Sequence, residues 1–543
     1  MSNGHYSFPQ PSNEPIQQFA PKSAEKLALK NALAKAKKTK LDIPMYIGDK
    51  EVKTGKTLDI RPPHETKHVL GKFHVGDASH VKDAIKSALQ AKDAWANMPW
   101  VSRANIFLKA ADLLATKYRY DMLAATMLCQ SKNAFQAEID STCELIDFLR
   151  FNVHFLSQIY SQQPISGAGM YNRVEYRPLE GFVLAVTPFN FTAIGGNLPT
   201  SAAMCGNVVV WKPANTQIYS AQLFMKILKE AGLPDGVINM VYVSGPVVGD
   251  VCFSHRDFAG VHFTGSTGVF NSMWKTIGEN IPKYRTYPRI VGETGGKDFV
   301  LVHESADVNE VATALARGAF EYQGQKCSAA SRAYLPDNIA AAIKKKLVAD
   351  VKSMKMGSTE DFTNFVNAVI DEKSFDNIKN YIETAKKDKS CKILVGGKCD
   401  KTKGWFVEPT VIETTDPKYK TMCEEIFGPV LTIYTYKAAE FDKICDVVDS
   451  TSDYALTGAV FSKDRYALEK AMKKLTNAAG NFYINDKPSG AVVGQQPFGG
   501  ARGSGTNDKA GSMLNLYRWL SARTIKETYN PPVDYSYAFM KEK

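Results

Sequence analysis

The chain has 543 residues, of which 44% are hydrophobic and 11% aromatic, which excludes a disordered protein and allows a large core. Its 67 basic and 56 acidic residues leave a net charge of +11, a modest excess that suits anionic small molecules better than nucleic acid. No run approaches about 18 consecutive hydrophobic residues, the length of a membrane span. We therefore expect a soluble protein with no nucleic-acid and no membrane partner.

The nine cysteines are loosely spaced, odd in number and free of any C-x-x-C pair. This pattern argues against a disulfide framework or a structural zinc site and favours a reducing compartment. His64 and His68 are four residues apart, but Pro62 and Pro63 disfavour the helix that would bring them together on a metal. We expect no metal centre.

The N-terminal region shows no hydrophobic stretch of the kind found in secretory signals. Residues 22–40 are rich in lysine, with Leu29 and Leu33 between, and predict a solvated surface helix. Mitochondrial transit peptides are rich in arginine and poor in acids, whereas here Arg61 is the first arginine and Glu25 intervenes. The segment therefore makes a poor transit peptide.

Hydrophobic periodicity predicts an α/β protein from residue 182 onward. Residues 79–161 have the three- and four-residue spacing of helices, and residues 169–179 alternate like a strand. Short hydrophobic strands separated by helices indicate parallel βαβ units. The strands are expected at 182–187, 208–211 and 237–243, with a helix at 219–231 between the last two. A second α/β series follows at 299–511, and the aromatic tail after residue 530 predicts an edge strand.

Three polar motifs follow predicted strands, on the side where open parallel sheets bind ligands. Asn190 offers an uncharged amide donor for an oxyanion, and Lys212 has the charge to hold a ribose or a phosphate. The Gly-Ser-Thr-Gly turn at 265–268 resembles a phosphate cradle but lacks the G-x-G-x-x-G spacing. Taken singly, each motif is better explained by an ordinary turn or an exposed lysine.

Two further residues carry reactive groups. Glu293 lies in a glycine-rich turn and is a candidate general base, although a capping or ion-paired glutamate would look the same. Cys327 follows Lys326 in a short polar segment, where a lowered thiol pKa is expected. No histidine accompanies these motifs, which disfavours a Cys–His hydrolase. Together, the cysteine, the glutamate and the amide donor favour thiohemiacetal chemistry with hydride transfer.

From about residue 40 to its end the chain resembles the aldehyde dehydrogenase superfamily. The E-x-G-G-K motif of that family corresponds to residues 293–297, G-Q-x-C to 324–327 and E-x-F-G-P to 425–429. Residues 188–197, 320–329, 481–487 and 493–500 resemble most closely the branch that oxidises L-glutamate 5-semialdehyde.

The resemblance implies an α/β aldehyde dehydrogenase fold with a Rossmann-like NAD-binding domain, an α/β catalytic domain and a small β oligomerisation flap. The expected limits are 1–165 for the N-terminal region and first part of the NAD-binding domain, 166–181 for an oligomerisation strand, 182–293 for the rest of the NAD-binding domain, 294–511 for the catalytic domain, and 512–543 for a C-terminal segment with a second oligomerisation strand. A homo-oligomer, dimeric or larger, is expected.

The resemblance also implies the catalytic roles. Cys327 would attack the aldehyde, Asn190 and the Cys327 backbone N–H would hold the oxyanion, and Glu293 would activate the water that hydrolyses the thioester. The cofactor would contact Thr187, Lys212, Gly265, Ser266, Thr267, Gly268, Val269 and Glu425. NAD is expected, but Asn215 stands where NAD-selective members often carry glutamate, which leaves NADP open. Phe270 replaces the glycine that many members carry after the phosphate turn.

The implied substrate is L-glutamate 5-semialdehyde, in equilibrium with 1-pyrroline-5-carboxylate, oxidised to L-glutamate in the second step of proline degradation. Its recognition would fall to Phe191, Lys326, Ser328, Gly490, Ala491 and Phe498. The alternatives are another NAD(P)-dependent semialdehyde dehydrogenase, or a catalytically silent binding or structural paralogue. The resemblance further implies a mitochondrial matrix location, with the cytoplasm as the alternative, and functional coupling to a proline dehydrogenase.

Overall fold

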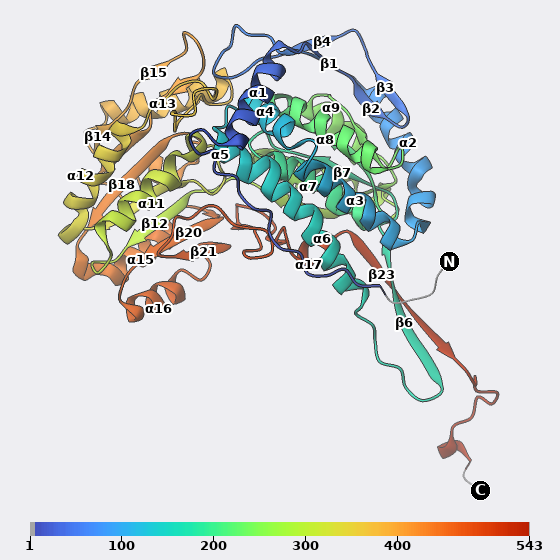
Figure 1. Ribbon diagram of the computed structural model, residues 1–543. Helices are drawn as coiled ribbons and strands as arrows, with labels where there is room; N and C mark the ends of the chain where they lie inside the picture. The colour runs from blue at the N-terminus through green and yellow to red at the C-terminus, as the bar shows by residue number, and fades with distance from the viewer. Residues whose placement is uncertain (1–5, 542–543) are drawn as a thin grey trace.

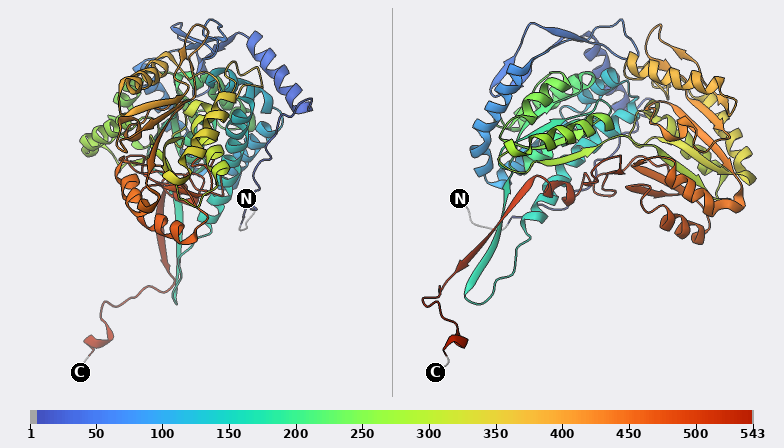
Figure 2. Two further views of the ribbon diagram at one scale, coloured as in Figure 1. Left: turned by 90° about the vertical axis from the view of Figure 1, so that its left-hand side faces the viewer. Right: turned by 180° about the vertical axis from the view of Figure 1, so that it is seen from behind.

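The computed structural model describes residues 6–541. Two seven-stranded sheets form separate bodies, and a long two-stranded ribbon projects from one of them (Figures 1 and 2). The α/β fold predicted from the sequence is confirmed by this mixture of sheets and covering helices. Among the described residues, no helix is both long and hydrophobic enough to cross a membrane.

The first sheet has the order β11-β10-β7-β8-β9-β2-β3, in which neighbours from β11 to β9 run parallel. Its strands are β2 (Met45–Ile47), β3 (Lys50–Val52), β7 (Phe182–Val186), β8 (Val208–Lys212), β9 (Ile238–Met240), β10 (Phe258–Thr264) and β11 (Arg289–Glu293). Strands β7 and β8 are buried at every position but the last, as expected for parallel strands covered on both faces.

Ten helices accompany this sheet within the described residues. They are α1 (Ala24–Lys38), α2 (Ala78–Asn97), α3 (Trp100–Ala115), α4 (Arg119–Gln130), α5 (Ala134–Ala137), α6 (Leu145–Tyr160), α7 (Thr192–Met204), α8 (Ile218–Ala231), α9 (Gly245–Phe253) and α10 (Thr267–Asn280). Helix α7 packs against β7, β8 and β10, and α2 packs against β8 and β9. A π-helical turn, Glu138–Glu144, links α5 to α6.

The second sheet has the order β14-β17-β18-β13-β12-β20-β21 and is parallel except for the β14–β17 pair. Its strands are β12 (Asp298–Val302), β13 (Ala330–Pro336), β14 (Cys391–Val395), β17 (Thr410–Thr414), β18 (Val430–Tyr436), β20 (Thr457–Phe461) and β21 (Asn481–Ile484). The predicted boundary between residues 293 and 294 falls between β11 and β12, while the domain limits as a whole stay predictions.

Alternate residues of β12 face two different hydrophobic cores. Phe299 and Leu301 pack with one set of helices, whereas Val300 and Val302 pack with the other. Helices therefore cover both faces of the sheet, and they are α11 (Val308–Phe320), α12 (Asp337–Ser353), α13 (Glu372–Lys387), α14 (Lys420–Cys423), α15 (Phe441–Ser450) and α16 (Arg465–Lys474). Short strand pairs β15 (Cys399–Asp400) with β16 (Phe406–Val407), and β19 (Tyr454–Ala455) with β22 (Ala501–Arg502), lie outside it.

The projecting ribbon pairs β6 (Met170–Pro178) with β23 (Leu520–Thr528) in antiparallel register (Figure 1). The strand expected at 169–179 is confirmed, but the edge strand expected after residue 530 is wrong. The C-terminal strand forms earlier, just after α17 (Met513–Tyr517), because residues 520–528 find a partner in β6. In the described tail beyond it, the chain forms only the short 3₁₀ helix Ala538–Met540.

The N-terminal region adds a three-stranded sheet of β1 (Leu41–Ile43), β5 (Gly71–His74) and β4 (Thr57–Ile60). Helix α1 is not simply a solvated surface helix as expected, since Leu29 and Leu33 are buried and the helix packs against α4. Lysines on its other face stay in solvent, so the helix is amphipathic.

Candidate active site

Two cavities meet at Cys327. The first has a volume of about 800 Å³ and the second about 430 Å³, and Cys327 lines both of them, together with Phe263 and Thr264. A side chain at this junction can contact one molecule in each cavity. This is the arrangement that a reaction between two bound molecules requires.

The segment before Cys327 is held in an unusual conformation. Tyr322 and Gln323 have φ of 50° and 55°, in the left-handed region that side chains rarely adopt. The Gln323 amide donates to the Ser131 and Ala368 carbonyl oxygens at 2.9 and 2.8 Å. Gly324 has φ of 64°, and a Cβ there would lie 2.2 Å from the Gly428 oxygen, so glycine is required. These constraints fix the position of the cysteine.

The Cys327 thiol is only 9% exposed, and its pKa is raised well above the ordinary value. Burial is the main cause, and the nearby carboxyl groups of Asp298, Glu293 and Glu425 act in the same direction. The prediction that Lys326 lowers the pKa of the Cys327 thiol is therefore wrong. The Lys326 ammonium instead contacts the Glu321 carboxylate at 3.0 Å, where its charge is compensated.

Glu293 ends β11 and faces the second cavity. Its Oε2 accepts a hydrogen bond from the Gly500 backbone N–H at 2.8 Å. Burial raises the pKa of the carboxyl well above its usual range, although the backbone donors and Lys509 oppose the shift. Glu293 therefore holds its proton more tightly than an exposed glutamate does.

Asn190 lies between β7 and α7 and lines the first cavity beside Cys327. Its Nδ2 donates to the backbone oxygen of Gln325 at 3.0 Å. An amide nitrogen carries two hydrogens, so the second remains available to an oxygen in the cavity. The bond to Gln325 fixes the amide relative to the cysteine loop.

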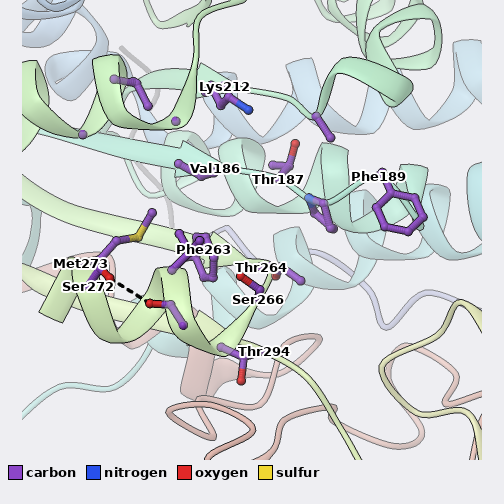
Figure 3. Close-up of a pocket in the computed structure, with 18 of the residues that line it drawn as sticks. Val186, Thr187, Phe189, Lys212, Phe263, Thr264, Ser266, Ser272, Met273 and Thr294 are labelled. Carbon is purple, nitrogen blue, oxygen red and sulfur yellow. Dashed lines mark hydrogen bonds between the residues drawn. The ribbon is translucent and has the colours of Figure 1, made fainter. Parts of the chain in front are cut away.

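Most residues predicted to contact the cofactor line the first cavity. They are Thr187, Lys212, Gly265, Ser266, Gly268, Val269 and Glu425. Figure 3 shows Lys212 and Thr187 on one side of the cavity and Ser266 and Met273 on the other. Thr267 is the exception, because its hydroxyl is hydrogen-bonded to Thr294 and Tyr454 at 3.2 Å rather than lining the cavity.

Charge and open backbone suit the first cavity to an anionic ligand. Lys212 ends β8, and burial lowers the pKa of its ammonium, which forms no ion pair or hydrogen bond within residues 6–541. The turn at 265–268 leads into the N-terminus of α10, where backbone N–H groups attract anions. In the same cavity, Glu425 accepts a hydrogen bond from the Gly296 N–H at 2.9 Å, and burial raises its pKa to about 7.

Phe270 fits the first sheet despite departing from the family pattern. Its ring stacks on Phe263 with centroids 5.4 Å apart, and it fills the space above Gly292. A side chain on Gly292 would meet that ring at 2.3 Å. The Phe270–Gly292 pair is thus matched in volume.

The residues predicted to contact the substrate all line the second cavity, namely Phe191, Lys326, Ser328, Gly490, Ala491 and Phe498. Gly490 has φ of 94°, a left-handed conformation that glycine adopts at no steric cost. The Phe191 ring is backed by the buried Lys132 ammonium, 4.1 Å from the ring centroid. The Phe191 ring, the Lys326 ammonium and the backbone of Gly490 and Ala491 thus line one cavity.

Several residues of the second cavity were missed by sequence reasoning. Asn13, Glu14 and Ile16 come from the N-terminal segment, while Glu144 and Asp147 come from the π-helical turn and α6. Burial raises the pKa of Glu144 to about 8 and that of Asp147 to about 6. No local motif marks them, because they reach the cavity only through tertiary packing. Within the described ranges, no cluster of three metal-ligating side chains occurs.

Comparisons with known proteins agree with this geometry. The model of the "Aldehyde dehydrogenase family" matches residues 51–525. The delta-1-pyrroline-5-carboxylate dehydrogenase, mitochondrial, of Dictyostelium discoideum is 54% identical over 98% of this chain and 96% of its own. The Delta-pyrroline-5-carboxylate dehydrogenase of Mycobacterium tuberculosis, solved with NAD bound, is 49% identical, with a TM-score of 0.96 and complete coverage of both chains.

A third relative is part of a longer protein. The proline utilization A protein of Bdellovibrio bacteriovorus is 31% identical with a TM-score of 0.91, over 96% of this chain and 53% of the other. The match to the family model and the identities over nearly the full length lead to one conclusion. The chain belongs to the aldehyde dehydrogenase family.

Proposed function

We propose that this protein oxidises L-glutamate 5-semialdehyde, in equilibrium with 1-pyrroline-5-carboxylate, to L-glutamate with NAD⁺. This is the second step of proline degradation. The observation that carries the proposal is the position of Cys327 at the junction of two cavities, one suited to a nucleotide and the other to a small amphipathic aldehyde. Relatives at about half identity over the full chain carry the same activity in their names.

The first cavity fits NAD⁺. Lys212 brings an ammonium, the 265–268 turn brings backbone donors and Glu425 brings a carboxylate for ribose hydroxyls. A Cβ on Gly268 would meet no atom within 4 Å, so the turn stays open to a close approach. When bound, NAD⁺ supplies the hydride acceptor for the oxidation.

The chemistry rests on three side chains of this chain. The Cys327 thiol gives its proton to water, and the sulfur attacks the aldehyde carbon to form the thiohemiacetal oxyanion. The second Asn190 N–H and the Cys327 backbone N–H stabilise the oxyanion. After oxidation to the thioester, Glu293 takes a proton from water in the second cavity, and the hydroxide releases glutamate.

The second cavity suits the amino-acid end of the substrate. Backbone donors of Gly490 and Ala491, with the Ser328 hydroxyl, fit the α-carboxylate, and the ammonium of Lys326, paired with Glu321, lies in the same wall as a further N–H donor. Phe191 and Phe498 enclose the aliphatic chain and so limit its length. An aldehyde without a carboxylate would leave these donors unused.

The biological setting follows from the relatives and the ribbon. We propose a mitochondrial matrix location, since the Dictyostelium relative is named mitochondrial. Coupling to a proline-oxidising enzyme is supported by the match to proline utilization A. The projecting β6–β23 ribbon exposes backbone edges that a second copy could cover, which supports a homo-oligomer.

NADH formation with three aldehydes tests the proposal. Pyrroline-5-carboxylate is compared with succinate semialdehyde, which lacks the amino group, and with propanal, which is uncharged. A kcat/KM for the first at least about a hundredfold above propanal is expected, since a charged donor–acceptor set is lost with propanal. Equal rates on all three would keep the dehydrogenase and refute the substrate.

A further inference from the structure

The N-terminal segment, residues 13–17, forms part of the wall of the second cavity. Asn13, Glu14 and Ile16 line that cavity with Cys327, although more than three hundred positions separate them in the chain. Figure 1 shows the dark blue chain before α1 running past α6. Its place beside the cavity suggests a part in substrate recognition.

The Asn13 amide adds a polar bridge between α6 and the 492–496 loop, which already meets α6 where Gly494 lies against the Phe151 ring. Its Nδ2 donates to Asp147 Oδ2 on α6 and to the backbone oxygen of Val493, both at 2.8 Å. Its Oδ1 accepts from Gln495 Nε2 at 2.9 Å. Both hydrogens of the amide and its carbonyl are therefore engaged, which fixes the orientation of the group.

The bridge ends on the loop that follows the proposed carboxylate donors. Val493 and Gln495 come two and four residues after Ala491, in a turn closed by hydrogen bonds from the Gln495 and Gln496 N–H groups to Val492. A closed turn moves as a unit. Holding Val493 and Gln495 therefore also holds the N–H groups of Gly490 and Ala491 at the cavity.

The N-terminal segment has anchors that do not depend on Asn13. The Glu14 carboxylate contacts Arg119 and Arg150 at 2.6 and 2.7 Å, and the Glu14 N–H donates to Asp147 at 2.8 Å. The Gln17 N–H donates to Glu138 at 2.9 Å. Removing the Asn13 amide would thus loosen the loop, which keeps its packing of Gly494 against Phe151, while the segment stays in place.

We propose that Asn13 is a positioning residue for the carboxylate end of the substrate. It acts through the 492–496 loop and sets the place of the Gly490 and Ala491 donors. This inference rests on the proposed function, because an aldehyde without a carboxylate has no use for those donors. The chemistry at Cys327 does not involve Asn13 directly.

The test compares full-length wild-type protein with Asn13→Ala. We expect the KM for pyrroline-5-carboxylate to rise about fivefold to tenfold, because the Gly490 and Ala491 N–H groups would form weaker hydrogen bonds to the substrate carboxylate. The kcat should stay within about twofold, and the KM for propanal should not change. The dissociation constant for L-glutamate, measured by calorimetry, should rise in parallel with the first KM.

Two further variants complete the test. Gln495→Ala removes one contact of the bridge from the loop side and should show the same pattern more weakly, so it decides the matter if Asn13→Ala does not fold. Gln18→Ala is the matched control, since the exposed Gln18 side chain bonds, among residues 6–541, only to the nearby Ile16 oxygen. It should leave every constant unchanged.

The outcomes separate this inference from the function beneath it. An unchanged KM for pyrroline-5-carboxylate in Asn13→Ala, or an equal rise for propanal, overturns the positioning role while the wild-type preference stands. If the wild-type protein shows no preference for pyrroline-5-carboxylate, the proposed function fails and the positioning role falls with it.

Discussion

The two cavities that meet at Cys327 are assembled in different ways. The first is lined largely by residues where β7, β8 and β10 end, so neighbouring strands of one sheet deliver Thr187, Lys212 and Thr264. The second gathers residues from Asn13 to Asn515, drawn from both bodies and from the N-terminal segment. The first cavity follows from the order of strands in one sheet, whereas the second depends on packing between distant segments. Substitutions in the two cavities should therefore have different effects.

Cys327 is the point that both cavities share, so its loss should have the largest effect. Cys327→Ala should reduce NADH formation by at least about a thousandfold, because no other nucleophile replaces the sulfur. Binding of NAD⁺, followed by calorimetry, should be retained because Lys212 and the 265–268 turn are untouched. Turnover close to that of the wild type would show that Cys327 is not the nucleophile and that the two cavities do not share one reactive atom.

Glu293 belongs to the second cavity alone and should separate the two halves of the reaction. Glu293→Gln should slow thioester hydrolysis by about a hundredfold or more while acylation continues, which gives a burst of about one NADH per site. Rapid-mixing absorbance measures the burst. Acylation slowed to the same extent would assign Glu293 to an earlier step.

The raised pKa of Glu293 gives a pH dependence with a definite sign. Only the ionised carboxylate can take a proton from water, so kcat should rise with pH as Glu293 loses its proton. Because burial raises this pKa, the rise should lie at higher pH than an exposed glutamate would give. Glu293→Gln should abolish that limb. A wild-type kcat that did not change from acid to neutral pH would contradict a protonated Glu293 in that range.

The same difference between the cavities explains what could be predicted from the sequence. Lys212 and the 265–268 turn follow hydrophobic strands directly, so local pattern finds them. Asn13 and Asp147 carry no local motif and meet only because the N-terminal segment packs along α6. The raised thiol pKa was missed for a similar reason, because it comes mainly from burial of Cys327 and then from Asp298 and Glu425, which approach from other segments. The positive charge of Lys326 is compensated by Glu321.

Lys212 tests the first cavity on its own. Lys212→Ala should raise the KM for NAD⁺ about tenfold, as the loss of one charged contact to a nucleotide predicts. The KM for pyrroline-5-carboxylate should stay unchanged because Lys212 does not line the second cavity. Lys226→Ala, on the exposed face of α8, is the matched control and should alter neither constant. A rise in both KM values for Lys212→Ala would mean that the cavities are coupled.

Ser328 tests the second cavity on its own, and its substitution should have the smallest effect. Its hydroxyl is one of several donors beside the cysteine, so Ser328→Ala should raise the KM for pyrroline-5-carboxylate only about fivefold, from about 1 kcal/mol for one hydrogen bond. The KM for propanal and that for NAD⁺ should be unaltered. Opposite responses of Lys212→Ala and Ser328→Ala would establish that the two cavities bind independently, although they share one reactive sulfur. If Ser328→Ala instead changed the KM for propanal equally, the hydroxyl would act on the cysteine rather than on the carboxylate. The preference for pyrroline-5-carboxylate over propanal would then have to rest on the backbone donors of Gly490 and Ala491, which Asn13 holds in place.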